Sequence, residues 1–415
     1  MKFLYNTGIY LYVTAIRLAS LYNKKAKIWI DGRRRLLKEI SQTIPEFTKI
    51  IWVHCSSLGE FEQGRPVIER LKSRCPDYKI LLTFFSPSGY EIRKHYPGAD
   101  YVFYLPADTP GNARKFIDHT RPAMALFIKY EYWYNYLNVL QEKKIPVFLF
   151  SAIFRPGQIF FRWYGKWWKK ILFMFDHIFV QNESSGHLLK KSGITSVTVS
   201  GDTRFDRVHQ IASNVKPIAI ARDFLNNAFT VIAGSTWPVD EALLVEFINN
   251  NQENIKWIIA PHEIKSDQLM KLQSSIAKPA VFYSQVTREK LPASDYNVLI
   301  IDNIGMLSSL YTYGQVAYIG GGFGKGIHNI LEAATFGLPV VFGPNFRKFN
   351  EAVELVKRGS AFVINDAKQL EKTIYLLHNN NEFRKSISAT TRKYVLERTG
   401  ATRIIVDKVL NYIRL

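Results

Sequence analysis

Two glutamates follow apolar runs at positions where a carboxylate could take a proton from a hydroxyl. Glu60 ends the segment His54-Cys55-Ser56-Ser57-Leu58-Gly59-Glu60, and Glu131 lies in the run Lys129-Tyr130-Glu131-Tyr132-Trp133. A carboxylate in such a strand-to-helix loop could act as general base on a sugar hydroxyl. Structural roles are the alternative, because the helix dipole favours a capping glutamate and Glu131 could pair with a nearby cation. Either segment taken alone favours the structural role.

A second group of loops is rich in glycine and hydroxyl side chains. Gly234-Ser235-Thr236 stands between an apolar run and a helical stretch, so its backbone N–H groups could cradle an anion. A glycine-rich loop, 320–326, leads into His328-Asn329-Ile330-Leu331-Glu332, where glycines would clear space for a ligand and Glu332 could accept ribose hydroxyls. This loop is neither a Walker loop nor a dinucleotide fingerprint. A tight turn before an amphipathic helix is the alternative, and it explains so many glycines less well.

One segment interleaves aromatic and cationic side chains. It runs from Phe160 to Lys170 and includes Arg162, Trp163, Lys166, Trp167, Lys169 and Lys170. Helical spacing would place Phe161, Tyr164 and Trp168 on one face, which is typical of an interfacial membrane helix. Stacking on single-stranded nucleic acid and a core helix with cations reaching solvent are the alternatives.

Short apolar runs alternating with helical stretches must position these residues. In the first half we expect strands at Ile50–Ser57, Lys79–Phe85, Tyr101–Leu105, Met124–Ile128, Pro146–Phe150, His177–Gln181 and Val197–Ser200. In the second half we expect strands at Thr230–Ala233, Trp257–Ala260, Ala280–Tyr283, Val298–Ile301, Val316–Ile319 and Pro339–Phe342. Continuous apolar strands alternating with helices predict parallel sheets covered on both faces. The fold class is therefore α/β, with two Rossmann-like doubly wound domains facing across a cleft.

The expected domain plan has five parts. Residues 1–35 form an N-terminal helix with a basic flank, 36–207 the first doubly wound domain, 208–228 a linker containing Pro217, and 229–390 the second domain. Residues 391–415 form a C-terminal helix that crosses back to the first domain. Ligands of α/β sheets bind outside the carboxyl ends of the strands, so the chemistry should lie in strand-to-helix loops.

Composition points to an anionic partner. The 415 residues hold 55 lysine and arginine against 35 aspartate and glutamate, a net charge of +20, and 14% are aromatic. Such a charge favours nucleic acid, anionic lipid or a phosphorylated substrate, although excess lysine can also serve solubility. Only two cysteines are present, which excludes a disulfide framework and fits a reducing compartment.

The amino-terminal segment resembles a membrane anchor. Phe3 to Tyr22 is mostly apolar but borderline against the about 20 residues that a spanning helix needs. Lys24, Lys25, Lys27 and Arg33 to Arg35 follow, which predicts a cytoplasmic flank. The alternative is a helix packed with its apolar face on the first domain.

Taken in order, the motifs resemble those of the 3-deoxy-D-manno-octulosonic acid (Kdo) transferases of lipopolysaccharide synthesis, which are membrane-bound GT-B glycosyltransferases. The matching tracts are Ser56-Ser57-Leu58-Gly59-Glu60, Ile128-Lys129-Tyr130-Glu131-Tyr132-Trp133, Gly201-Asp202-Thr203-Arg204-Phe205-Asp206, Ala233-Gly234-Ser235-Thr236, Ala260-Pro261-His262, Asp302-Asn303-Ile304-Gly305, His328-Asn329-Ile330-Leu331-Glu332 and Phe342-Gly343-Pro344. Lys129, Arg204 and Met306 depart from the family, which commonly has Glu, Lys and Glu at these positions. The Ala260-Pro261-His262 tract is a shortened form of the family's A-P-R-H-P.

The resemblance implies inverting transfer of Kdo from CMP-Kdo to a lipid A precursor, without a metal or other cofactor. Glu60 would be the general base, Glu131 would stabilise the transition state, and Arg204 would stabilise the leaving group. The implied CMP contacts are Ser235, Thr236, Pro261, His262, Ile304, Gly305, Met306, Asn329, Ile330, Leu331 and Glu332. The first domain would bind the acceptor and the second CMP-Kdo.

The same resemblance places the protein at the cytoplasmic face of the inner membrane. Its cationic aromatic segment, with Arg162, Trp163, Lys166, Trp167, Lys169 and Lys170, would meet the acceptor or the leaflet, and no nucleic acid partner is expected. Two alternatives stay open: a UDP-sugar enzyme such as a lipid-A-disaccharide synthase or a nucleotide-sugar epimerase, and a non-catalytic membrane- or nucleic-acid-binding protein. Competition by CMP against UDP separates the enzymes, and a steep salt dependence would indicate the binding protein.

Overall fold

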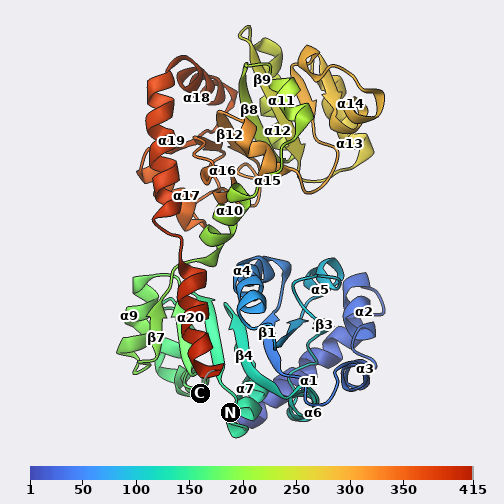
Figure 1. Ribbon diagram of the computed structural model, residues 1–415, viewed down its shortest axis with the longest axis vertical. Coiled ribbons are helices and arrows are strands. Elements are labelled where there is room, and N and C mark those ends of the chain that lie inside the picture. Colours follow the sequence, from blue (N-terminus) through green and yellow to red (C-terminus); the bar gives the residue numbers. More distant parts are fainter. Residues whose placement is uncertain (414–415) are drawn as a thin grey trace. The chain divides into compact units, whose positions relative to one another are not determined.

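The computed structural model describes residues 1–413, which form two compact α/β units (Figure 1). Unit 1 holds residues 1–207 together with the C-terminal segment from Thr399, and unit 2 holds residues 208–398. Each unit is built on a seven-stranded parallel sheet. Two parallel-sheet domains are consistent with the expected GT-B class.

The sheet of unit 1 has the strand order β3-β2-β1-β4-β5-β6-β7. Its strands are β1 (Ile50–Cys55), β2 (Lys79–Phe84), β3 (Tyr101–Tyr104), β4 (Pro122–Ile128), β5 (Val147–Ala152), β6 (His177–Val180) and β7 (Val197–Val199). Its helices are α1 (Lys2–Ala19), α2 (Lys24–Asp31), α3 (Leu36–Thr43), α4 (Leu58–Arg74), α5 (Pro87–Arg93), α6 (Pro110–Thr120), α7 (Tyr134–Glu142), α8 (Lys166–Leu172), α9 (Glu183–Lys191), the first part of α10 (Thr203–Ser213) and α20 (Ala401–Ile413). Strands β1 and β4 are buried along nearly their whole length, as expected for a sheet covered on both faces.

The sheet of unit 2 has the order β10-β11-β9-β8-β12-β13-β14. Its strands are β8 (Phe229–Thr236), β9 (Ile255–Pro261), β10 (Ala280–Phe282), β11 (Val298–Ile300), β12 (Val316–Ile319), β13 (Val340–Phe342) and β14 (Ala361–Val363). Its helices are α11 (Ala219–Leu225), α12 (Pro238–Asn250), α13 (Ser266–Ser275), α14 (Tyr283–Glu289), α15 (Leu307–Leu310), α16 (Leu331–Ala334), α17 (Asn350–Lys357), α18 (Ala367–Asn379) and α19 (Asn381–Leu396). The edge strand β14 is missing from the sequence-based expectation.

The segment 208–228, which was expected to be a linker, begins at the boundary between the two units and is largely helical. It contains the end of α10 and all of α11, with Pro217 between them. Val208 and Phe224 are buried, so these helices pack into the units instead of spanning solvent. The connection between the units is therefore made of two short helices with Pro217 between them.

The C-terminal part is two helices, whereas one helix over 391–415 was expected. Helix α19 ends at Leu396, and the chain passes through Gly400, whose φ of +112° favours glycine, before α20 begins. Asp206 fixes this restart by accepting hydrogen bonds from Gly400 N at 2.6 Å and Thr402 N at 2.7 Å. Helix α20 belongs to unit 1, where its apolar face joins the core beside α4 (Figure 1). The last two residues of the expected helix, 414 and 415, lie outside the described residues.

Helix α1 lies on unit 1, and one of its faces packs there. The Tyr5 hydroxyl donates to Asp108 Oδ2 at 2.6 Å, and the Tyr5 ring contacts Trp167 and Trp168. The opposite face exposes large apolar side chains, namely Phe3, Leu4, Tyr10, Leu11 and Leu18. None of the helices in residues 1–413 has the length and apolar character needed to cross a bilayer.

The cationic aromatic segment does not form the continuous helix that its spacing predicts. Two short 3₁₀ turns, Ile159–Phe161 and Trp163–Gly165, precede α8. Gly165 permits this tight path, because a Cβ there would lie 1.6 Å from the Ile159 carbonyl oxygen. Phe160 is buried, whereas Trp163 and Tyr164 are exposed. The three aromatic residues predicted to share a face are therefore not aligned along one helix.

Candidate functional site

The first candidate site lies where the strand order of unit 1 reverses. Chain order runs outward from β1 through β2 to β3, and then resumes on the other side of β1 with β4. The loops after two such strands diverge, which leaves room for a ligand at their carboxyl ends. Glu60 follows β1 and Glu131 follows β4, so both predicted carboxylates come to this switch point.

Glu60 caps the helix that carries it. Its Oε2 accepts hydrogen bonds from Ser56 N at 2.6 Å and Ser57 N at 3.1 Å, while the Glu60 N–H donates to Ser57 Oγ at 3.4 Å. This reciprocal pattern is a capping box, so the structural alternative for Glu60 is present in the fold. Its second oxygen, Oε1, accepts no hydrogen bond from the described residues and stays available to a ligand.

The surroundings of Glu60 favour its neutral form more than water does. Burial, followed by the charge of Glu131, raises the pKa of Glu60 to about 7, against the opposing effect of the Ser56 and Ser57 N–H groups and Lys129. A carboxylate whose pKa lies near neutrality can both accept and release a proton efficiently. Capping and proton transfer are therefore compatible, because they use different oxygens of one carboxylate.

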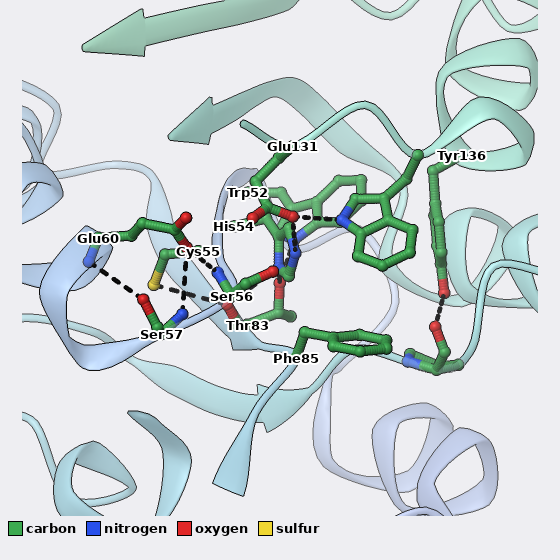
Figure 2. Close-up of polar contacts among 12 residues, drawn as sticks. Trp52, His54, Cys55, Ser56, Ser57, Glu60, Thr83, Phe85, Glu131 and Tyr136 are labelled. Carbon is green, nitrogen blue, oxygen red and sulfur yellow. Dashed lines mark hydrogen bonds and ion pairs between the residues drawn. The ribbon is translucent and has the colours of Figure 1, made fainter. Parts of the chain in front are cut away.

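Glu131 is buried and held by two ring N–H groups. Its Oε2 lies 3.1 Å from His54 Nε2 and also accepts a hydrogen bond from Trp133 Nε1. Burial acts to raise the pKa of Glu131, but the hydrogen bond and charge of His54, together with hydrogen bonds from Ser56 and Trp133, lower it below its ordinary value. Glu131 is thus ionised, and its negative charge acts on Glu60. Figure 2 shows Ser56 between these two glutamates.

His54 is the residue of this site that sequence analysis missed. It is fully buried in β1, and its Nδ1 lies 2.9 Å from Thr83 Oγ1, which in turn accepts a hydrogen bond from Trp52 Nε1 (Figure 2). An ionised carboxylate only accepts, so Nε2 carries the hydrogen shared with Glu131. The available signal was a histidine inside an apolar strand two residues before Ser56.

Arg204 lies at the start of α10 and is paired within its own turn. Its Nε donates to Asp202 Oδ2 at 2.8 Å, and its Nη2 lies 2.7 Å from the same oxygen. The neighbouring Thr203 hydroxyl donates to the Gln63 carbonyl at 2.5 Å, one turn after Glu60 in α4. The tract from Gly201 to Asp206 therefore joins α4, α10 and α20, and Asp202 orients the guanidinium.

The second candidate site lies at the matching switch point of unit 2, between β8 and β12. Ser235 and Thr236 end β8, and the glycine-rich loop follows β12. Asp240, which sequence analysis did not select, ties the two together. Its buried carboxylate accepts from Gly321 N at 2.9 Å, from Trp237 N at 2.9 Å and from Tyr318 OH at 2.8 Å.

Some glycines of the glycine-rich loop are required for close packing of the backbone, whether or not they also clear space for a ligand. A Cβ on Gly320 would lie 2.2 Å from the Ser235 carbonyl oxygen, and one on Gly322 would lie 2.5 Å from Gly343 N. Such distances are far below van der Waals contact. Backbone segments cross here so closely that side chains do not fit.

Three rings stack beside this loop. His262 lies between Trp237 and His328, with ring centroids 4.7 and 4.3 Å away. Trp237 Nε1 donates to His328 Nε2 at 3.0 Å, which requires that nitrogen to be unprotonated. Burial, followed by the charge of His262, lowers the pKa of His328, in agreement with a neutral ring. Trp237 and His328 were not among the predicted contacts.

The remaining predicted contacts of unit 2 lie at or near α15, α16 and the end of β9. Glu332 accepts hydrogen bonds from Ser308 Oγ and from Asn329 Nδ2, so α15 and α16 are linked. Ile304, Gly305 and Met306 lead into α15, and Ile304 is almost fully exposed. Ile330 and Leu331 bury their side chains completely, which leaves only their backbone groups for a ligand. Pro261 ends β9, next to His262.

The predicted acceptor or membrane residues lie along the surface of unit 1 beside α1. Arg162, Trp163, Lys166 and Lys170 are exposed, whereas Trp167 and Lys169 are partly buried. Trp167 also contacts Tyr5 of α1, with ring centroids 5.7 Å apart. The cationic aromatic segment therefore packs beside the face of α1 that contacts unit 1.

Comparison with known proteins gives one family. Residues 30–207 match the family described as 3-deoxy-D-manno-octulosonic-acid transferase. Among curated proteins, the chain is 27% identical over 343 residues to 3-deoxy-D-manno-octulosonic acid transferase of Aquifex aeolicus, covering 80% of this chain and 88% of that one. It is also 27% identical to the enzyme of the same name from Rickettsia felis, covering 80% and 72%.

Solved structures support the fold. UDP-GlcNAc 2-epimerase from Neisseria meningitidis superposes with a TM-score of 0.60 at 17% identity, covering 88% of this chain and all of that one. A fold of this kind hosts several chemistries, so this likeness concerns the architecture alone.

Proposed function

We propose that the chain is a member of the 3-deoxy-D-manno-octulosonic acid (Kdo) transferase family, whose model matches residues 30–207, and that it is a glycosyltransferase of lipopolysaccharide biosynthesis. Its donor is CMP-Kdo, and its acceptor is a phosphorylated, acylated disaccharide precursor of lipid A. The observation that carries the proposal is Glu60, a helix-capping carboxylate with a pKa of about 7 and one oxygen available at the switch point of a doubly wound sheet.

In the proposed reaction, a primary hydroxyl oxygen of the acceptor bonds to the anomeric carbon of Kdo. The bond from that carbon to the phosphate oxygen of CMP breaks, and CMP leaves with the electron pair. Glu60 Oε1 takes the hydroxyl proton. Attack from the face opposite CMP inverts the anomeric carbon.

Glu131 acts in this scheme mainly through its fixed negative charge. That charge helps to raise the pKa of Glu60, so the base holds a proton more strongly than an ordinary glutamate would. It would also stabilise positive charge that develops on the sugar ring. His54 and Trp133 hold the carboxylate in one orientation. Arg204, oriented by Asp202, would meet the negative charge on the leaving phosphate.

Unit 2 suits a nucleotide more than it suits proton transfer. Ser235, Thr236 and the loop that Asp240 ties to them offer hydroxyl and backbone groups to a phosphate. Glu332 and Asn329 are linked hydrogen-bonding groups of the kind that ribose hydroxyls need. The stack of Trp237, His262 and His328 forms an aromatic surface next to these groups.

The acceptor is amphiphilic, so we also propose that unit 1 docks on the anionic cytoplasmic leaflet of the inner membrane. The docking surface comprises Phe3, Leu4, Leu11, Leu18, Trp163 and Tyr164, flanked by Arg162, Lys166 and Lys170. Exposed apolar and aromatic side chains beside cations are typical of proteins that lie on a membrane instead of crossing it.

The proposed reaction is tested by mass spectrometry of the product formed from CMP-Kdo and a tetra-acylated, bisphosphorylated glucosamine disaccharide. We expect the acceptor mass to increase by Kdo residues. CMP should inhibit the reaction competitively against CMP-Kdo, and UDP should not. A purified chain that makes no product under these conditions, or that uses a UDP-sugar instead, would contradict the proposal.

Docking is tested by co-sedimentation with vesicles of phosphatidylglycerol and phosphatidylethanolamine. W163A/Y164A should reduce the bound fraction several-fold, and wild-type binding should weaken as salt increases. The matched variant F160A also removes an aromatic ring from the segment, but a buried one, and serves to show the effect of lost packing alone. Equal binding by wild type and W163A/Y164A would contradict this surface.

A further inference from the structure

A cavity of about 650 Å³ lies in unit 1 between α1, the α2–α3 turn and the loop after β3. Five cationic residues line it, namely Arg17, Arg33, Arg34, Arg35 and Lys38. Among the described residues of its lining, none is acidic. So many cations around one cavity repel one another unless an anion joins them.

Most of these cations have no carboxylate partner. Arg34 pairs with Asp31 at 3.2 Å, and Asp31 does not line the cavity. Arg17, Arg35 and Lys38 form no ion pair with any carboxylate in residues 1–413. Three charged heads are thus available to a ligand in the cavity.

Arg33 anchors the wall without being neutralised. Its guanidinium donates to the backbone carbonyls of Trp29 at 3.1 Å, Phe85 at 2.7 Å and Leu105 at 2.9 Å. It also lies 3.9 Å from the centre of the Trp29 ring. Burial lowers the pKa of Arg33 to about 9, which reflects the cost of holding a cation away from water. An anion in the cavity would offset that cost.

Apart from Asn112, the remaining side chains of the lining are apolar and include Val13 of α1, Trp29 and Leu37. Helix α1 thus contributes Val13 and Arg17 to the cavity and also presents an exposed apolar face to the surroundings. A ligand that fits both features carries an anionic head and a hydrocarbon part. A free nucleotide or a soluble sugar phosphate would contact the cationic side chains but would leave the apolar surface without a partner.

The cavity and Glu60 lie along one edge of the sheet. Phe85, whose carbonyl binds Arg33, is followed by Ser86, whose N–H donates to the Ser56 carbonyl at 2.9 Å. Ser56 in turn donates its own N–H to Glu60. A short run of backbone contacts therefore connects the wall of the cavity to the proposed base.

We propose that this cavity binds a phosphate monoester carried on an acylated sugar, which orients the acceptor toward Glu60. The identity of the acylated sugar rests on the function proposed above, whereas the recognition of an anionic amphiphile rests on the cavity itself. The cationic run 33–35 is then part of a ligand site, and not only the basic flank of an anchor that the sequence suggests.

The kinetic test compares R35Q/K38Q with K190Q/K191Q, a control that removes the same charge from the surface of α9 in the same unit. For the bisphosphorylated acceptor we expect R35Q/K38Q to raise KM at least tenfold, with kcat and the KM for CMP-Kdo unchanged. The control should stay within twofold of wild type. An acceptor that lacks the recognised phosphate should bind wild type and R35Q/K38Q equally weakly.

A binding test removes any dependence on catalysis. ³¹P NMR titration of the full chain with dodecyl phosphate, below its micelle concentration, should show saturable binding that R35Q/K38Q weakens at least tenfold. Inorganic phosphate should compete only weakly. Equal affinity for inorganic phosphate and dodecyl phosphate would show that the cavity does not recognise an amphiphile. Equal binding of dodecyl phosphate by wild type and R35Q/K38Q would show that the cavity is not the binding site.

The two proposals fail in different ways. If wild type forms no Kdo product, the proposed function is wrong, and dodecyl phosphate binding still decides the cavity. If product forms and R35Q/K38Q matches K190Q/K191Q in acceptor KM, the cavity proposal is wrong and the transferase remains.

Discussion

The two units carry their candidate sites at the same place in the same topology, but the sites are made of different groups. At the β1/β4 switch point of unit 1, ionisable side chains meet in a buried cluster: Glu60, Glu131 and His54. At the β8/β12 switch point of unit 2, backbone N–H groups, hydroxyls and stacked rings dominate. The one buried carboxylate central to that site, Asp240, binds the protein's own backbone.

This difference teaches how one fold can divide a reaction. In the proposed reaction, proton transfer needs a group whose pKa lies near neutrality, and in unit 1 burial and a like-charged neighbour raise the pKa of Glu60 to about 7. The nucleotide binding that we propose for unit 2 would need fixed donors and a close approach of backbone, and a glycine-rich loop tied by Asp240 has both features. Substitutions at the two switch points should therefore affect different kinetic parameters.

The largest expected effect is on Glu60. E60Q keeps a side chain of the same size but loses the base, so we expect kcat to fall by about 10²–10⁴ with the KM for CMP-Kdo nearly unchanged. E62Q, two residues later and paired with Arg93 at the surface, is the control and should retain activity. Near-normal turnover by E60Q would refute the role of Glu60 as base. The measurement is initial-rate kinetics at saturating acceptor.

A smaller effect is expected from neutralising Glu131. The base works when deprotonated, so kcat/KM of wild type should fall as pH decreases through about 7, the pKa of Glu60. E131Q removes the like charge that helps to raise this pKa, and the acidic limb should therefore move to lower pH. We also expect kcat to fall about 10-fold, from lost stabilisation of positive charge.

The pH profile separates this role from a merely structural one. A variant that is only destabilised has a lower kcat/KM at every pH, but its kcat/KM still falls at the same pH as in wild type. If kcat/KM of E131Q falls at the same pH as that of wild type, Glu131 does not raise the pKa of Glu60. Circular dichroism melting curves of both variants give the loss of folding stability independently.

The smallest effect is expected in unit 2 from G320A. The added Cβ would lie 2.2 Å from the Ser235 carbonyl oxygen, and forcing the two segments apart costs about 1–3 kcal/mol of stability. The KM for CMP-Kdo should rise while the pH limb stays in place. G324A is the matched control, since its Cβ would meet no atom closer than 3.7 Å. A change of pH profile in G320A would break the proposed division between the units.

Local patterns in the sequence were sufficient for most of the framework. Apolar runs such as 50–55 and 316–319 become buried strands, and the loops that follow them carry the predicted Glu60, Glu131 and Ser235. The local patterns did not predict a strand that is very short, nor a chain path that depends on one glycine and its packing. Strand β14 is only three residues long, and the path over 159–172 is set by Gly165, which permits a turn that helical spacing does not predict.

What the sequence determined by itself is which residues stand directly after strands, because alternation of apolar and helical stretches is a local property of the chain. What only the tertiary structure decided is which of them meet. His54 and Glu131 are 77 residues apart, and the order of strands in the sheet brings them to 3.1 Å. Burial among residues remote in sequence also raises the pKa of Glu60 and lowers the pKa of Arg33. Burial is a property of the folded chain alone.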